Sequence, residues 1–266
     1  MNILDRILAT KRDEVTVLRR PQTRTLLRKV ALDAPPTRDF AAALRRDDRH
    51  PGLIAEIKRK SPSKGDLALD LDPGALAKEY ESGGATALSV LTDVPYFGGA
   101  IEDLEAARDA TSLPVLRKDF VIDEVQVYES RAVGADAILL ILAALPDDEL
   151  LTDLAELAHG LGLGVLVEAH DAAEVERGVA LEMPILGVNA RNLGTFVEDL
   201  GGASQLIDLI PSATITVAES AIRNANDAMR MAAAGFDALL VGEALVRSDD
   251  APGLARALVA PTVAPR

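Results

Sequence analysis

The sequence contains no cysteine, no tryptophan and only three histidines. Without cysteine, disulfide bonds, thiolate nucleophiles and thiolate metal ligands are excluded. The histidines (His50, His159 and His170) are not paired at the spacing of metal ligands, and no Asp-x-Asp cluster ends an apolar strand-like segment. We therefore expect no metal site.

Long apolar runs and an excess of positive charge are also missing. No run approaches the roughly 20 apolar residues of a membrane-spanning helix. Residues 1–6 mix charged and apolar side chains, unlike a signal peptide, so we expect a cytoplasmic protein with no membrane partner. The net charge of −14 argues against a nucleic-acid partner, because such proteins usually carry a basic face. It does not argue against a small anionic substrate, since surface charges are screened beyond about 8 Å.

Short apolar segments alternate with stretches of helical periodicity along most of the chain. The predicted strands are 53–58, 87–91, 115–118, 137–142, 165–168, 185–189, 215–219 and 238–242. The predicted helices between them include 73–82, 100–110, 124–133, 147–161, 172–180 and 224–234. Such alternation is typical of parallel strands joined by right-handed helical crossovers.

Eight such units favour an α/β fold of the (β/α)8 TIM-barrel class, which commonly uses about 250 residues as one domain. We expect a single domain over residues 1–266, with a helical extension at 1–48 and the barrel at 49–260. The extension, with apolar residues at helical spacing, either closes the bottom of the barrel or helps to cover the active site. A doubly wound open sheet is the alternative fold.

The polar exceptions in the predicted strands lie at or just after their carboxyl ends, where TIM-barrel enzymes carry their active sites. They are Glu56, Lys58, Lys118, Glu168, Asn189, Arg191 and Glu219. In a closed barrel these side chains would meet at one mouth, and they suit an anionic substrate that undergoes proton transfer. For any single pair, the alternative is a buried ion pair that only positions strands.

The charge mixture also leads to an expectation about pKa values. Clustered lysines lower each other's pKa and nearby glutamates oppose that effect, so we expect lysine pKa values tuned toward neutrality. His170, just after Glu168, is interpreted as an ordinary loop or capping residue.

The loops after the seventh and eighth strands predict a phosphate site, because TIM barrels often bind phosphate there through backbone N–H groups. These loops contain Ser220, Ala221, Gly242 and Glu243. The glycine-rich stretch 160–164 precedes a strand, so it predicts a turn and not a dinucleotide-binding loop. The basic stretch 58–65 follows the first strand and predicts a flexible flap over an anionic substrate, with a solvated loop as the alternative.

Six ordered motifs resemble those of the indole-3-glycerol-phosphate synthase family. They are IAEIKRKSPS (54–63), LSVLTD (88–93) with Tyr96 and Phe97, VLRKDF (115–120), VLVEAH (165–170), GVNARNL (187–193) and VAES (217–220). The resemblance implies ring closure of 1-(2-carboxyphenylamino)-1-deoxyribulose 5-phosphate to indole-3-glycerol phosphate, carbon dioxide and water, a step of tryptophan biosynthesis. It implies a phosphorylated small-molecule substrate and no cofactor. We expect a monomer, with a possible functional link to tryptophan synthase.

The resemblance also implies roles for individual residues. Lys118 would be the general acid at the carbonyl oxygen, and Glu168 the general base or the stabiliser of the cationic intermediate. Lys58 would bind the carboxylate or the phosphate side of the substrate and share acid duties in dehydration. Glu56, Asn189 and Glu219 would orient the lysines and the sugar hydroxyls. The remaining roles are carboxylate binding by Ser61 and Arg191, apolar walls from Phe97, Phe120 and Leu193, and phosphate binding by Ser220, Ala221, Gly242 and Glu243.

Two positions in the phosphate loops are unusual. The family commonly has glycine where this chain has Ala221, and alanine at positive φ costs about 1–2 kcal/mol. Glu243 beside a phosphate is unfavourable unless its side chain points away.

Other enzyme classes fit the residues less well. A phosphoribosylanthranilate isomerase or a histidine-pathway isomerase would use a Cys/Asp or Asp/Asp pair, and a metal-dependent epimerase would need His and Asp ligands. A non-catalytic barrel that only binds a ligand is the remaining alternative.

Overall fold

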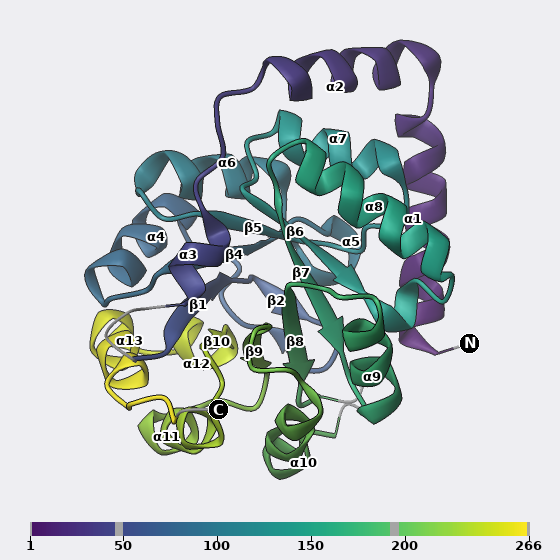
Figure 1. The fold of residues 1–266 in the computed structure, drawn as a ribbon. Coiled ribbons are helices and arrows are strands. Elements are labelled where there is room, and N and C mark those ends of the chain that lie inside the picture. Colours follow the sequence, from purple (N-terminus) through teal and green to yellow (C-terminus); the bar gives the residue numbers. More distant parts are fainter. Residues whose placement is uncertain (1, 46–49, 192–196, 265–266) are drawn as a thin grey trace.

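The computed structural model describes residues 2–45, 50–191 and 197–264 (Figure 1). Its centre is a closed barrel of eight parallel strands: β1 (Gly52–Ile57), β4 (Ala87–Leu91), β5 (Val115–Lys118), β6 (Ala137–Ile141), β7 (Gly164–Ala169), β8 (Ile185–Asn189), β9 (Ile215–Glu219) and β10 (Ala238–Val241). Because β10 pairs with β1, the predicted TIM barrel is confirmed and the open sheet is wrong.

Helices surround the barrel (Figure 1). They are α4 (Pro73–Ser82), α6 (Ile101–Ala110), α7 (Glu124–Ala132), α8 (Asp148–Gly160), α9 (Ala172–Ala180), α10 (Leu200–Leu206), α11 (Ala225–Ala234) and α13 (Ala251–Val259), with the short α5 (Val94–Phe97), α12 (Glu243–Val246), η1 (Leu142–Ala144) and η2 (Ile207–Leu209). Side chains such as Asp72, Asp147 and Asn224 cap helix N-termini by accepting backbone N–H bonds. Among the helices that the structure describes, none is long and apolar enough to cross a membrane.

The N-terminal helices α1 (Ile3–Leu18), α2 (Pro21–Asp33) and α3 (Phe40–Leu44) have different positions on the barrel. Phe40 and Leu44 of α3 join the buried cluster that fills the barrel interior, so α3 closes the bottom. The first turns of α1 reach the opposite end, where Ile3 and Ile7 line a pocket. Both roles considered for the extension therefore occur, in different helices. In Figure 1, α2 lies outside the barrel against α7.

A buried lysine fastens α1 to the barrel. Lys11 is 2% exposed, and its Nζ lies 2.8 Å from Asp119 Oδ1 and 3.0 Å from Asp93 Oδ2. Burial alone would lower the pKa of Lys11, but these carboxylates and Glu14 raise it above its ordinary value. Arg117 approaches the other oxygen of Asp119 at 3.2 Å. The residue after Lys118 is thus held between two cations.

Lys11→Met is expected to lower the free energy of unfolding by about 3–5 kcal/mol, because it leaves buried carboxylates without their cation. Urea unfolding followed by circular dichroism measures this loss. Lys29→Met, at an exposed position of α2, is the matched control and should change stability little. A loss as small as that of the control would show that the ion pairs of Lys11 do not anchor α1.

Candidate active site

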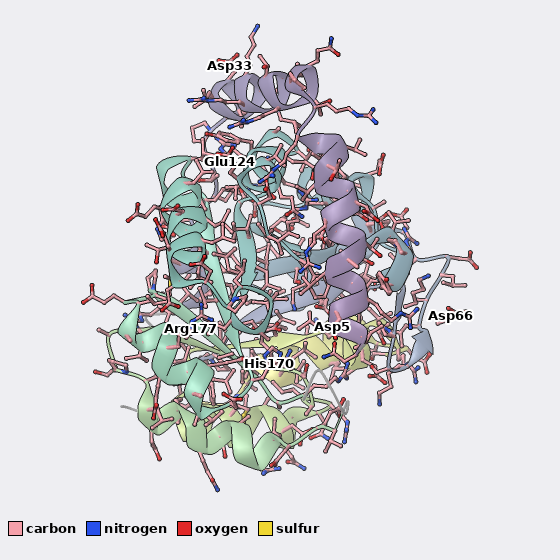
Figure 2. The ribbon with its side chains drawn as sticks, turned by 90° about the vertical axis from the view of Figure 1, so that its right-hand side faces the viewer. Asp5, Asp33, Asp66, Glu124, His170 and Arg177 are labelled. Carbon is pink, nitrogen blue, oxygen red and sulfur yellow. The ribbon has the colours of Figure 1, made fainter. Side chains whose placement is uncertain are left out.

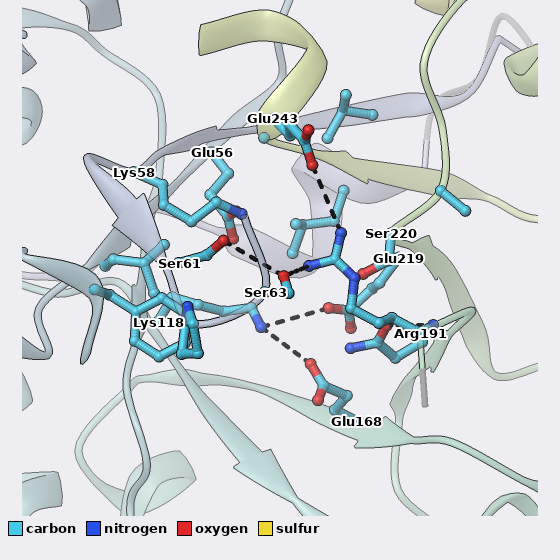
Figure 3. A pocket seen from close by; sticks show the side chains of 18 of the residues that line it. Glu56, Lys58, Ser61, Ser63, Lys118, Glu168, Arg191, Glu219, Ser220 and Glu243 are labelled. Carbon is cyan, nitrogen blue, oxygen red and sulfur yellow. Dashed lines mark hydrogen bonds and ion pairs between the residues drawn. The ribbon is translucent and has the colours of Figure 1, made fainter. Parts of the chain in front are cut away.

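A cavity of about 370 Å³ lies at the carboxyl ends of the barrel strands (Figure 3). Every described residue that the sequence analysis singled out for the site lines it: Glu56, Lys58, Ser61, Phe97, Lys118, Phe120, Glu168, Asn189, Arg191, Glu219, Ser220, Ala221, Gly242 and Glu243. Leu193 lies outside the described residues. The barrel therefore brings together side chains that come from seven of its strands or the loops after them.

Lys118, at the end of β5, lies between carboxylates from two other strands (Figure 3). Its Nζ donates to Glu168 Oε2 on β7 at 3.0 Å and lies 3.7 Å from Glu219 Oε2 on β9. Burial alone would lower the pKa of Lys118, but Glu168, Glu219 and Glu56 raise it above its ordinary value. The expectation of a pKa near neutrality is wrong for this lysine, because it faces carboxylates and not other lysines.

The pKa values of Glu168 and Glu219 are shifted in opposite directions although both side chains are almost completely buried. Burial favours the neutral form of each, but Lys118 and His170 hold the pKa of Glu168 well below its usual range. Burial and the negative charge of Glu168 raise the pKa of Glu219 well above its usual range, and Lys118 only partly opposes them. The site therefore favours the ionised form of Glu168 and the protonated form of Glu219 beside the ammonium of Lys118.

Glu56 and Lys58 lie two residues apart at the end of β1 and form an ion pair. Two glycines leave the space that the glutamates of the site occupy. A Cβ atom at Gly242 would lie 2.3 Å from Glu56 Oε1, and one at Gly187 would lie 2.1 Å from Glu219 Oε1. The carboxylate of Glu56 thus packs against Gly242, directly after β10, and that of Glu219 packs against Gly187 on β8, because neither glycine has a side chain.

His170 lies in the loop between β7 and α9, where the sequence analysis expected a loop or capping residue, and its ring has two charged neighbours. Its Nε2 lies 3.1 Å from Glu168 Oε1 and its Nδ1 lies 3.0 Å from Glu174 Oε2. In Figure 2 the label of His170 lies near that of Asp5, in the first turns of α1. The sequence did not indicate that Glu168 and Glu174 lie on both sides of the ring, because only the fold shows where Glu168 points.

Arg191 connects three parts of the pocket rim. Its backbone N–H donates to Asn189 Oδ1 at 3.0 Å, and its guanidinium donates to Ser63 Oγ at 3.2 Å and to Glu198 Oε1 at 2.5 Å. The ribbon of β2 (Lys60–Ser61) and β3 (Gly65–Asp66) carries Ser63 at its turn, so the basic segment expected as a flap borders the pocket. Glu198 was not predicted as a site residue, because its ion pair with Arg191 becomes apparent only in the folded protein.

The predicted phosphate loops have an unusual backbone and unusual charges. Ser220 and Ala221 adopt φ of 67° and 60°, so the positive φ considered for Ala221 is present. Glu243 does not point away from the pocket. Its carboxylate lies 3.7 Å from Lys64 Nζ and from Arg191 Nη2, so nearby cations offset its charge.

One wall of the pocket is apolar. The rings of Phe97 and Phe120 have centroids 6.2 Å apart, and Ile3, Leu4 and Ile7 of α1 line the same pocket. This wall suits an aromatic substrate, whereas the opposite rim is rich in charge. Within residues 2–45, 50–191 and 197–264, no group of three or more His, Cys, Asp or Glu side chains could hold a metal ion.

The sequence was then compared with known proteins. Residues 4–258 match the family model described as indole-3-glycerol phosphate synthase. The chain belongs to the indole-3-glycerol phosphate synthase family. An indole-3-glycerol phosphate synthase from Laribacter hongkongensis is 49% identical over 259 residues, which cover 96% of this chain and 98% of that protein. One from Paenarthrobacter aurescens is 48% identical over 257 residues, covering 95% and 93%.

The barrel itself is shared beyond the synthase family. A thiamine phosphate pyrophosphorylase from Pyrococcus furiosus superimposes with a TM-score of 0.58 at 17% identity, covering 79% of this chain and 94% of that chain. At this identity the likeness shows the fold alone. The resemblance inferred from the six motifs is confirmed by the family match.

Gly242→Ala is expected to push the Glu56 carboxylate away from Lys58 and to cost about 1–3 kcal/mol of stability, because the added methyl overlaps Glu56 Oε1. The backbone of Gly242, with φ −122° and ψ −71°, lies outside the helical and extended regions that alanine prefers, so backbone strain adds to the overlap. Thermal unfolding measures the loss. Gly160→Ala, where a Cβ meets nothing within 4 Å, is the control and should be neutral or stabilising. Equal melting temperatures for the two variants would contradict the tight contact.

Ala221→Gly is expected to raise the free energy of unfolding by roughly 1 kcal/mol, because glycine adopts positive φ without a steric cost. The melting temperature should rise by about 2–4 °C. Glu182→Gly, at φ 54° and outside the pocket lining, is a matched control that relieves the same strain elsewhere. A drop in stability at Ala221→Gly would mean that the methyl group packs favourably enough to offset its strain.

Proposed function

We propose that this chain is a carboxy-lyase that converts 1-(2-carboxyphenylamino)-1-deoxyribulose 5-phosphate into indole-3-glycerol phosphate, carbon dioxide and water. Family membership supports this reaction class. The single observation that best supports catalysis in this chain is the buried ammonium of Lys118, held between Glu168 and Glu219 at the base of a half-apolar pocket. Such a group is a proton donor placed where water is largely excluded.

The substrate has two anionic ends, which the pocket would hold apart. The carboxylate would lie near Lys58, Ser61 and Arg191, while the phosphate would lie near the backbone of Ser220–Ala221 and Gly242, with Glu243 at its edge. The aromatic ring between them would pack on Phe97 and Phe120, with Leu193 as a further wall. Holding both ends folds the ring onto the ribulose carbonyl, which lowers the entropic cost of ring closure.

In the first step Lys118 would donate a proton to the carbonyl oxygen while the ring carbon that carries the carboxylate bonds to the carbonyl carbon. Loss of carbon dioxide then returns an electron pair to the ring. Once Lys118 has given up its proton, Glu168 no longer faces an ammonium group on Oε2, so its affinity for a proton rises. Acid and base are thereby coupled: donation by one strengthens the other.

In the second step the new hydroxyl leaves as water. Lys58 would supply the proton to the departing oxygen, oriented by Glu56, and Glu168 would accept the proton from the neighbouring carbon. Asn189 and the neutral carboxyl of Glu219 would orient the sugar hydroxyls. The electrons come from the aniline nitrogen, so the sequence of bond changes balances without a cofactor. A monomeric state, a cytoplasmic location and a link to tryptophan synthase stay predictions.

The fluorescence of the indole product gives a direct assay with low background, since the protein has no tryptophan. The wild type should turn the substrate over without added metal. Lys118→Ala should lower kcat by about 10²–10⁴-fold, because it removes the proton donor. Lys78→Ala, at an exposed position of α4, is the control and should keep full activity.

Circular dichroism must show that Lys118→Ala is folded, since it leaves two glutamates facing each other. A folded Lys118→Ala variant with wild-type kcat would overturn the role of Lys118. Binding of the substrate by folded wild type without any turnover would favour the non-catalytic barrel instead.

A further inference from the structure

The imidazole ring of His170 lies between two carboxylates on different elements. Glu168 Oε1, at the end of β7, is 3.1 Å from Nε2, and Glu174 Oε2, in the first turn of α9, is 3.0 Å from Nδ1. Glu174 also accepts the backbone N–H of His170 at 2.8 Å. The side chain of His170 is only 8% exposed, so solvent has little access to the ring.

This arrangement selects one charge state of the ring. A neutral imidazole donates from one nitrogen only and would turn a lone pair toward one of the two carboxylates. The imidazolium form carries an N–H on both nitrogens: Nδ1 hydrogen-bonds Glu174, and Nε2 forms an ion pair with Glu168 outside hydrogen-bond geometry. Burial alone would lower the pKa of His170, but Glu168 and Glu174 raise it to about 10. At neutral pH His170 is therefore a cation.

Glu168 is consequently held by a different cation on each of its oxygens. Lys118 on β5 faces Oε2 at 3.0 Å, and His170 faces Oε1. The other ionisable groups near Lys118, Glu168 and His170 are Glu219 on β9, Glu56 on β1 and Glu174 on α9. When Lys118 donates its proton to a substrate, His170 is the cation that remains in contact with Glu168.

We propose that His170 is a positioning residue that fixes the direction of the Glu168 carboxylate and keeps it ionised after Lys118 has lost its charge, while Glu174 holds the ring. This inference rests on the proposed function. Without His170, the Glu168 carboxylate would more readily bind a proton before the second step and could not then accept the proton from carbon. His170 itself neither touches the reacting atoms nor transfers a proton.

The test compares kcat and KM from pH 3 to 9 for the wild type, His170→Ala and His170→Gln. In His170→Ala we expect kcat to fall on the order of tenfold or more with KM nearly unchanged, and the acid limb of the kcat profile to move up by about one pH unit. His170→Gln keeps an N–H donor without the charge, so it should recover part of kcat but leave the acid limb shifted. Glu174→Gln should give a smaller shift in the same direction.

The control is His159→Gln, at an exposed position of α8, which should match the wild type. An unshifted acid limb in a folded, active His170→Ala variant overturns the proposal, as does an effect confined to KM. If the wild type itself shows no turnover, the proposed function fails, and the catalytic role of His170 fails with it.

An NMR titration without substrate tests the charge of His170 independently of turnover. The protein has three histidines, so their ring signals in NMR spectra can be assigned with the two glutamine variants. The ring of His170 should remain protonated at pH 8 and become neutral near that pH in Glu168→Gln, because one carboxylate is lost. Titration of the wild-type ring near the ordinary value of about 6.5 would overturn the ion pairs and the proposal together.

Discussion

A buried positive charge must be paired, and in this barrel the charge of Lys118 is paired across the interior. Its partners, Glu168 and Glu219, come from β7 and β9, so these three side chains meet only when the sheet closes. An unpaired ammonium at this depth would be strongly destabilising, whereas here the surrounding carboxylates make the charged form the stable one. Closing the barrel therefore also brings together the carboxylates that keep the proton donor charged despite its burial.

Buried charges are also paired around Asp119, the residue that follows Lys118. Asp119, next to Lys118, is fixed by Lys11 and Arg117, which hold its pKa at about 2 despite burial. Lys11 comes from α1, whose first turns form part of the apolar wall. Helix α1, which forms part of the apolar wall, is thus bound through Lys11 to Asp119, the residue next to Lys118. The same ion pair therefore helps to position the apolar wall and the proton donor.

Local sequence signals predicted most of the architecture. Alternating periodicity gave every barrel strand to within one residue at each end, because burial on both faces makes each strand an apolar run with a polar end. The candidate residues could be found for the same reason: a charge at the end of such a run stands out. α10 and α13 were not predicted: α10 has only seven residues and gives a weak periodic signal, whereas α13 is as amphipathic as the helices that were predicted.

Pairing between distant segments was beyond the sequence. Nothing near Lys11 indicates that its partners lie at Asp93 and Asp119, and nothing near His170 shows that Glu168 turns toward it. The expectation for the lysine pKa values was wrong for this reason, because the sign of a pKa shift depends on which charges are nearest in space. Residue types indicated the chemistry of the site, but the protonation states needed the three-dimensional arrangement.

The contacts of Gly242 with Glu56 and of Gly187 with Glu219 carry a consequence for how this barrel can vary over evolutionary time. In each pair, the carboxylate occupies the volume that a side chain on the neighbouring strand would need. Neither member can change freely while the other stays: a methyl at position 242 or 187 requires a shorter acid opposite, and a shorter acid leaves a void that favours the methyl. We expect the two residues of each pair to change together. A double replacement, glycine by alanine and glutamate by aspartate, is tolerated where either single replacement is not.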